Sequence, residues 1–314
     1  MNITNMCGSR VAHPLLISLA NIKMDVRNKG SLHAFLLLAL MPIAKFTHHI
    51  SRMHSVLDAR LLHQCLNIIL EPLKQAARIG QMMADPIGNL QYCFTPLVSY
   101  IVDTPEACIL ACVRFNTSPV TTATYKDFGD LDHHQPRTAA TTLSQLASIE
   151  CDIGDVVEYF AACKQFQLSG VSHPFYQDWP LVQPSEFITS ESLYEWHHEF
   201  WDHNVRWCTQ ALGAAELDFR FSIVPHITGL HHFSSGITKL KRVGRRAKRN
   251  IQRFIVVVIA GATDPDVIIV VHALMEFRYL SQATAITSIT CDKIKAALQE
   301  FHDHKHAIID NGFY

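Results

Sequence analysis

One carboxylate in this chain, Asp103, lies where it could act as a catalytic or metal-binding acid. Residues 91–106 read QYCFTPLVSYIVDTPE, and the β-branched and aromatic run over residues 97–102 is typical of a buried strand. Asp103 follows this run directly and can cap the next helix, with Pro105 in the first helical turn. Capping alone explains such a residue. Because α/β enzymes also place metal-binding and catalytic acids at the carboxyl ends of strands, Asp103 is also a candidate Mg²⁺ ligand.

Other carboxylates would have to join Asp103 for metal-dependent catalysis. Two-metal phosphoryl transfer needs several acids around ions about 4 Å apart. Glu216 and Asp218, in the segment AAELDFRF, are the alternative partners, and Asp202 in FWDHN is a further acid. An active Mg²⁺-dependent phosphoryl-transfer enzyme would need one of these carboxylates within about 5 Å of Asp103. One acid at a strand end is not a two-metal site.

Cysteine and histidine residues offer a second kind of site. Cys108 and Cys112 lie four residues apart on a predicted helix, and His133 and His134 follow about twenty residues later. Structural zinc pairs have two to four residues between their cysteines, so these four residues are candidate zinc ligands. The alternative is a pair of small apolar thiols that face a core.

A dense basic run is the third feature. Residues 239–253 carry eight cations and no acid, whereas the whole chain is balanced at 27 basic and 28 acidic residues. Such density is typical of a surface that contacts nucleic-acid phosphates or of a nuclear-import signal. The alternative is a solvated helix face. No aromatic residue interrupts the run, so base stacking is not indicated. The candidate DNA-contacting residues are Lys239, Lys241, Arg242, Arg245, Arg246, Lys248, Arg249 and Arg253.

Several function classes lack their motifs. The sequence has neither GxGxxG nor GxxxxGK[ST], so a nucleotide cofactor has no phosphate-binding loop, and no GxSxG marks a hydrolase nucleophile. The nine cysteines are odd in number and irregularly spaced, and no secretory leader precedes them, which predicts reduced intracellular thiols. The longest apolar runs are too short for a membrane span. We expect a nuclear or cytosolic protein that is neither secreted nor membrane-bound.

Hydrophobic patterning predicts one early strand and then mostly helices. We expect a strand over residues 13–22, a helix over 31–43 and an amphipathic helix over 50–79 that Pro72 kinks or splits. A turn at DPIGN, residues 85–89, precedes the next strand. The later predicted helices span residues 105–113, 143–149, 156–166, 190–213, 267–282 and 290–304, and an ordered loop spans 170–184.

Long blocks of this sequence resemble a known family. RLLHQCLNIILEPLKQAARIGQMMADPIGNLQYCFTPLVSYIVDTPE, the HPFYQDWPL loop, LYEWHHEFWDHNVRWC, AELDFRF and HHFSSGITKLKRV occur in this order. Together they resemble the Plavaka-type transposases of fungal genomes, which are related to the CACTA group. The resemblance covers essentially the whole chain.

The resemblance implies a DDE transposase with an RNase H-like core that binds Mg²⁺. It implies an α-rich α/β fold in which residues 13–22 form the last strand of the opening hairpins, residues 31–43 the first helix and residues 91–102 the fourth strand. Asp103 then matches the second acid. The implied segments are a partial RNase H-like core over 1–115, a mainly helical insertion over 116–235, and a basic segment with C-terminal helices over 236–314.

The chain also departs from the family pattern. The first acid should lie upstream of residues 13–22, where this chain has no Asp, and Ala247 occupies the position of the third acid, with Asn250 at another expected acidic position. We therefore expect a truncated, degenerate copy without bound Mg²⁺ or catalytic activity that retains DNA-backbone binding. Two alternatives remain: an active Mg²⁺ enzyme that uses Asp103 with Glu216 or Asp218, and a helical scaffold that binds partners through aromatic residues 193–207.

Overall fold

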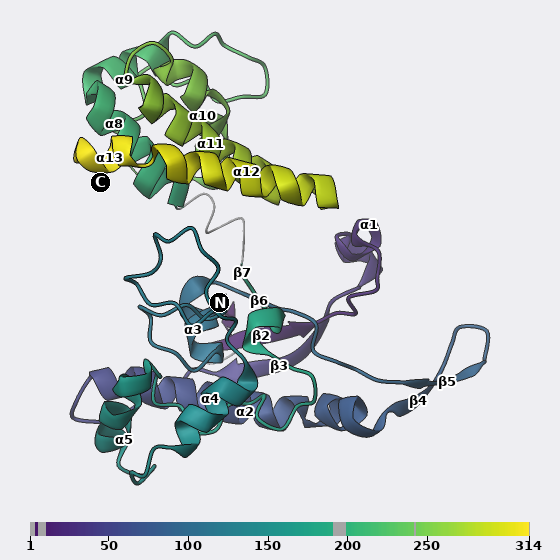
Figure 1. Ribbon diagram of the computed structural model, residues 1–314. Coiled ribbons are helices and arrows are strands. Elements are labelled where there is room, and N and C mark those ends of the chain that lie inside the picture. The colour runs from purple at the N-terminus through teal and green to yellow at the C-terminus, as the bar shows by residue number, and fades with distance from the viewer. Residues whose placement is uncertain (1–3, 6–10, 191–198, 242, 314) are drawn as a thin grey trace. The chain divides into compact units, whose positions relative to one another are not determined.

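The chain forms two compact units, Met1–Ser190 and Glu191–Tyr314, each with its own core. The computed structural model describes residues 4–5, 11–190, 199–241 and 243–313 (Figure 1). Its helices outnumber its short strands, so the predicted α-rich α/β class is confirmed.

The first unit begins with a three-stranded antiparallel sheet in the order β1–β2–β3. The strands are β1 (Thr4–Asn5), β2 (Val11–Ile17) and β3 (Leu36–Pro42). The strand expected over residues 13–22 is confirmed in its first half, but the helix expected over 31–43 is wrong. β3 pairs with β2 from Ala12 opposite Pro42 to Ile17 opposite Leu36, with one shift of register between Leu15 and Leu16. A short apolar run fits a strand as well as a helix, and the pairing with β2 decides between them. Between the strands lie α1 (Met24–Arg27) and η2 (Gly30–Leu32).

Helix α2 (Arg52–Ile79) is the longest element of the first unit and runs unbroken through Pro72. The amphipathic helix is confirmed, and of the two effects expected at Pro72, a kink or a split, the split does not occur. Proline removes one hydrogen bond from a helix, but the buried residues Leu66, Leu70 and Lys74 hold the turns on both sides against the core. Gly80, at φ +73°, ends the helix.

A hairpin follows α2 and projects from the unit (Figure 1). Its strands are β4 (Gln81–Ala84) and β5 (Leu90–Cys93). The predicted turn at residues 85–89 is confirmed, since the Asp85 carboxylate accepts the backbone N–H groups of Ile87 and Asn89 at 3.0 and 2.9 Å. The single strand expected over residues 91–102 is wrong: its start pairs with β4, and Pro96 then interrupts the ladder because it has no N–H to donate.

A second strand forms at the end of that segment. β6 (Tyr100–Val102) pairs in parallel with β7 (Ile188–Ser190), and α3 (Thr104–Leu110) follows β6 directly. The remaining elements of the unit are α4 (Ala139–Ala147), α5 (Val156–Cys163), η3 (Lys164–Phe166) and α6 (Pro184–Phe187). They agree with the helices predicted over residues 143–149 and 156–166.

The loop before α6 supplies much of the first core. Residues 171–183 contain no helix or strand, as predicted, yet Phe175, Tyr176 and Trp179 are buried. Phe175 makes edge-to-face contacts with Tyr176, Trp179 and Phe187. Such pairs add directional stabilisation to their apolar burial. The loop is therefore a structural part of the core and not a surface connection.

The second unit is helical. Its elements are the π-helix η4 (Phe200–Val205), α8 (Arg206–Leu212), α9 (Ala214–Ser222), α10 (Arg245–Ile259), α11 (Pro265–Ser281), α12 (Ser288–His304) and α13 (His306–Asp310). The two helices predicted over residues 267–282 and 290–304 are confirmed. Of the helix expected over residues 190–213, the part from residue 200 is helical, Ser190 lies in β7, and residues 191–198 lie outside the described residues. No described helix has the length and apolar character needed to cross a membrane.

Candidate functional site

Asp103 stands at the carboxyl end of β6, beside the parallel strand β7. Its Oδ1 accepts the backbone N–H of Glu106 at 3.0 Å, and Pro105 lies in the first turn of α3, so the predicted N-cap is confirmed. One oxygen of the carboxylate is thus committed to the helix. Asp103 thus lies at the carboxyl end of a parallel strand, where enzymes often place catalytic acids. Its hydrogen bond to Glu106, however, has a structural role, because it caps α3.

Glu106 is a second acid at this place that the sequence interpretation did not single out. Its side chain is buried, and burial, together with the negative charge of Asp103, raises its pKa to about 7. The spacing Asp-x-x-Glu is common at helix starts, where the glutamate closes a capping box, so the pattern alone gives no sign of a perturbed acid. Asp103 and Glu106 are the two residues that would offer oxygen ligands to a cation here.

Replacing Glu106 with glutamine should remove a pH dependence of stability. The folded-state pKa of about 7 lies above the ordinary 4.5, so the stabilising proton is fully present below pH 4.5 and is lost as pH rises towards 7. The wild-type free energy of unfolding should therefore fall by about 1.4 kcal/mol per pH unit across this window. Denaturant unfolding from pH 4.5 to 8 measures it.

Glu158 provides the matched control, because it occupies the same position after the N-cap Asp155 of α5 but is exposed. Glu158→Gln should keep the wild-type slope, whereas Glu106→Gln should flatten it. A slope unchanged by Glu106→Gln would show that this acid ionises freely in the folded protein.

The four candidate zinc ligands fall into two separate places. The Cys112 thiol is buried 3.6 Å from Nε2 of His63, and burial raises its pKa to about 12. The Cys108 thiol faces the carbonyl of Thr117 at 3.7 Å. His133 and His134 lie on the loop before α4. Within the described ranges, no three His, Cys, Asp or Glu side chains gather into a group able to hold a metal, so the two thiols and two imidazoles are not brought together.

Asp218 and Glu216 lie on α9, and both already have structural partners. Asp218 accepts the N–H groups of Ile237 and Thr238 at 2.7 and 2.8 Å and the Thr238 hydroxyl at 2.6 Å. Burial alone would raise the Asp218 pKa, but these hydrogen bonds lower it. Gly236, at φ +77°, allows the close approach, because a Cβ there would collide with the Asp218 carboxylate. Glu216 pairs with Arg220 at 2.6 Å. Asp103 belongs to the first unit and these two acids to the second.

The second part of the basic run, residues 245–253, forms the N-terminal part of α10. Arg246, Arg249 and Arg253 are exposed and follow one another at helical spacings of three and four residues, which puts them on one side of the helix. We call these three residues the arginine stripe. On the opposite side, Ile251 and Ile255 are fully buried. The amphipathic pattern of α10 thus turns part of a linear run into a single charged face.

The other cations of the basic run do not belong to the arginine stripe. Lys239 and Lys241 are exposed on the segment before α10, and Lys248 is half-buried. Arg242 and the side chain of Arg245 lie outside what the structure describes. Ala247, expected at the position of an acid, is half-buried against the second core, and Asn250 is buried.

The stripe is not neutralised by nearby acids in the described part of the chain. There, no carboxylate forms an ion pair with Arg246, Arg249 or Arg253, and Arg246 Nη2 donates to the Gly229 carbonyl at 3.1 Å. Tyr279 of α11 lies close by: burial raises its pKa, and the charges of Arg253 and Arg249 oppose that rise. The sequence interpretation missed this aromatic neighbour, because 26 positions separate it from Arg253.

The comparisons with known proteins give one match. A family model described as Plavaka transposase matches residues 1–208. Neither the curated proteins nor the solved structures contain a match. The matched range includes Asp103 and Glu106 and ends before α9 and the arginine stripe.

Proposed function

The chain belongs to the Plavaka transposase family and is a transposon-derived, transposase-like protein, and we propose that its second unit binds the DNA backbone through the arginine stripe without catalysing strand cleavage. The observation that carries the DNA contact is the convergence of Arg246, Arg249 and Arg253 on one exposed face of α10. Because the family match ends at residue 208, this contact is argued from geometry and charge alone.

The stripe suits phosphates and not bases. Its three guanidinium groups extend over about 10 Å of helix length, at 1.5 Å per residue. Arginine donates to phosphate oxygens in a bidentate manner, and cations without acidic partners release counterions from DNA when they bind. Contacts of this kind position a protein on the duplex without reading its sequence. We therefore expect sequence-independent binding.

Catalytic inactivity is supported by what the candidate acids already do. Asp103 caps α3, Asp218 holds the segment before α10, and Glu216 pairs with Arg220. Mg²⁺, which the family implies, needs ionised oxygen ligands. Asp103 and Glu106 are the two acids at this place, and among the described residues no third His, Cys, Asp or Glu side chain joins them to complete a metal-holding group. We therefore derive no catalytic step there.

An RNase H-like ancestry of the first unit and a nuclear location belong to the same proposal. The antiparallel sheet β1–β2–β3, followed by α2 and by a strand that ends in Asp103, supports the first. The basic run, which also matches an import signal, supports the second.

The test is binding of two labelled 20-base-pair duplexes of unrelated sequence, read by fluorescence anisotropy with and without Mg²⁺. We expect equal dissociation constants of about 1 μM or less for the two duplexes at about 50 mM salt. We expect no nicked or joined product on a denaturing gel. A strong preference for one duplex would contradict backbone binding. Mg²⁺-dependent product that disappears in Asp103→Asn would establish the active-enzyme alternative.

The scaffold alternative receives no specific support from residues 199–207. Phe200 and Val205 are buried in the second core, and Trp201 packs against it. The rest of the aromatic segment named for that function, residues 193–198, lies outside the described residues.

A further inference from the structure

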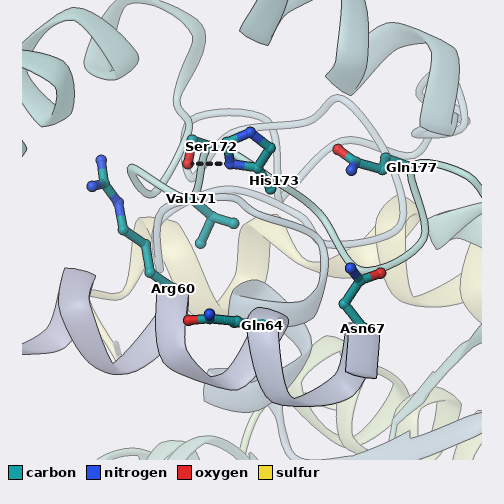
Figure 2. Close-up of a pocket in the computed structure, with 7 residues that line it drawn as sticks. All are labelled: Arg60, Gln64, Asn67, Val171, Ser172, His173 and Gln177. Atoms are coloured by element: carbon teal, nitrogen blue, oxygen red, sulfur yellow. Dashed lines mark hydrogen bonds between the residues drawn. The ribbon is translucent and has the colours of Figure 1, made fainter. Parts of the chain in front are cut away.

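A pocket of about 420 Å³ lies in the first unit, and Asp103 is not among the residues that line it. Its floor is the middle of α2, which contributes Arg60, Gln64 and Asn67, and the loop opposite contributes Ser172, His173 and Gln177. Figure 2 shows Asn67 and Gln64 on the helix and the Ser172–His173 pair and Gln177 across from them. The volume lies in the range of pockets that hold small molecules.

Hydrogen bonds and an ion pair join the two walls of this pocket, helix α2 and the loop opposite. Nδ1 of the buried His63 accepts the N–H of Phe175 at 3.0 Å, and Arg60 Nε donates to the Gly170 carbonyl at 2.9 Å. Lys74, fully buried, pairs with Asp178 at 2.5 Å. Helix α2 and the loop are thus fixed to each other at several points. A pocket with fixed walls loses little conformational entropy when a ligand enters.

Three carboxamide side chains and no carboxylate line the pocket. The carboxamides are those of Gln64, Asn67 and Gln177, each with donor and acceptor atoms. The Asn67 oxygen accepts from Lys74, which directs the Asn67 NH₂ group as a donor. Paired donors and acceptors of this kind match the edges of nucleobases, as asparagine and glutamine do when they read adenine.

Two further groups favour a phosphate beside the base. Ser172 Oγ and His173 Nδ1 form a hydrogen bond of 2.9 Å, which leaves Nε2 of the exposed His173 for a ligand. Arg60 adds a positive charge to a lining that has no negative one. An anionic ligand with a flat, hydrogen-bonding end therefore suits this pocket better than a cation or an apolar molecule.

We propose that this pocket binds one nucleoside monophosphate unit, with the base held by Gln64, Asn67 and Gln177 and the phosphate by Nε2–H of His173, whose Nδ1 accepts from Ser172 Oγ. The unit is either a free nucleotide or an unpaired nucleotide of a DNA strand. The pocket is independent of the arginine stripe, so the two proposals stand or fall separately.

The experiment is calorimetric titration of the full chain with each of the four deoxynucleoside monophosphates, with deoxyribose phosphate and with an unstructured six-base oligonucleotide. The variant Gln64→Leu/Gln177→Leu removes two carboxamides from exposed positions, and Gln75→Leu makes the same change at an exposed position of α2 that does not line the pocket. We expect the affinity for at least one monophosphate to fall at least about 10-fold in the double variant and to stay unchanged in Gln75→Leu.

The arms of this experiment separate the outcomes. Tighter binding of the oligonucleotide than of the best monophosphate identifies a strand as the source, and the reverse identifies a free nucleotide. Equal binding of deoxyribose phosphate and the nucleotides, no saturable binding, or equal losses in both variants would overturn the proposal. In a protein with Arg246, Arg249 and Arg253 changed to glutamine, nucleotide binding should persist. Failure of the pocket proposal can therefore be told apart from failure of the DNA-backbone proposal.

Discussion

Changing Arg246, Arg249 and Arg253 together to glutamine is expected to weaken duplex DNA binding by about 100-fold at about 100 mM salt. The three residues are exposed on α10 and form no ion pair with a carboxylate in the described ranges, so their replacement removes charge without exposing a buried partner. Removal of each arginine–phosphate interaction should reduce the salt slope of log affinity by about one. Anisotropy titrations at several salt concentrations measure both quantities.

The matched control carries the same change in net charge elsewhere. Lys23, Lys293 and Lys295 are exposed and lie outside α10, and their replacement by glutamine should leave the affinity within about twofold of wild type. Equal losses of affinity in the two triple variants would mean that net charge, and not the arginine stripe, determines binding.

Replacing Asp178 with alanine is expected to destabilise the first unit by about 3 kcal/mol, because it leaves the charge of Lys74 buried without its ion partner. The Lys74 side chain has 0% exposure, whereas that of Asp178 has 42%. Asn67 is the other side chain that accepts a hydrogen bond from Lys74. For a unit of this size the melting temperature should fall by roughly 6–12 °C. Thermal unfolding followed by circular dichroism measures it.

Two controls separate the buried charge from loss of a surface acid. Asp132 is exposed on a loop of the same unit, and Asp132→Ala should change stability by less than about 0.5 kcal/mol. Adding Lys74→Met to Asp178→Ala should recover most of the stability, since an apolar side chain of similar length needs no ion partner. If the double variant is as unstable as Asp178→Ala alone, the loss of stability comes from impaired packing and not from the unpaired charge of Lys74.

Local rules predicted the elements that depend on local chemistry. The amphipathic pattern of helix α2, the turn at residues 85–89 and the Asp103 cap all follow from residue spacing and side-chain type. The structure confirms all three. The helix expected over residues 31–43 was wrong because a short apolar run does not say whether its backbone pairs with a distant strand. Pairing between β2 and β3 is non-local and decides that segment.

The candidate sites divide along the same line. The basic run was visible in the sequence, but which of its cations face solvent depends on the burial of Ile251 and Ile255 in the core of the second unit. The raised pKa of Glu106 likewise depends on burial that its capping spacing does not reveal. The nucleotide pocket was not predicted, because it joins α2 to a loop about a hundred residues later.

The most direct test of the central claim is the salt dependence of duplex DNA binding by the unaltered chain. Three phosphate contacts from the arginine stripe predict that log affinity falls linearly with log salt, with a slope near or steeper than about −3, from an affinity near or tighter than micromolar at low salt. An affinity that does not change with salt, or no binding tighter than micromolar at the lowest salt, would contradict the account.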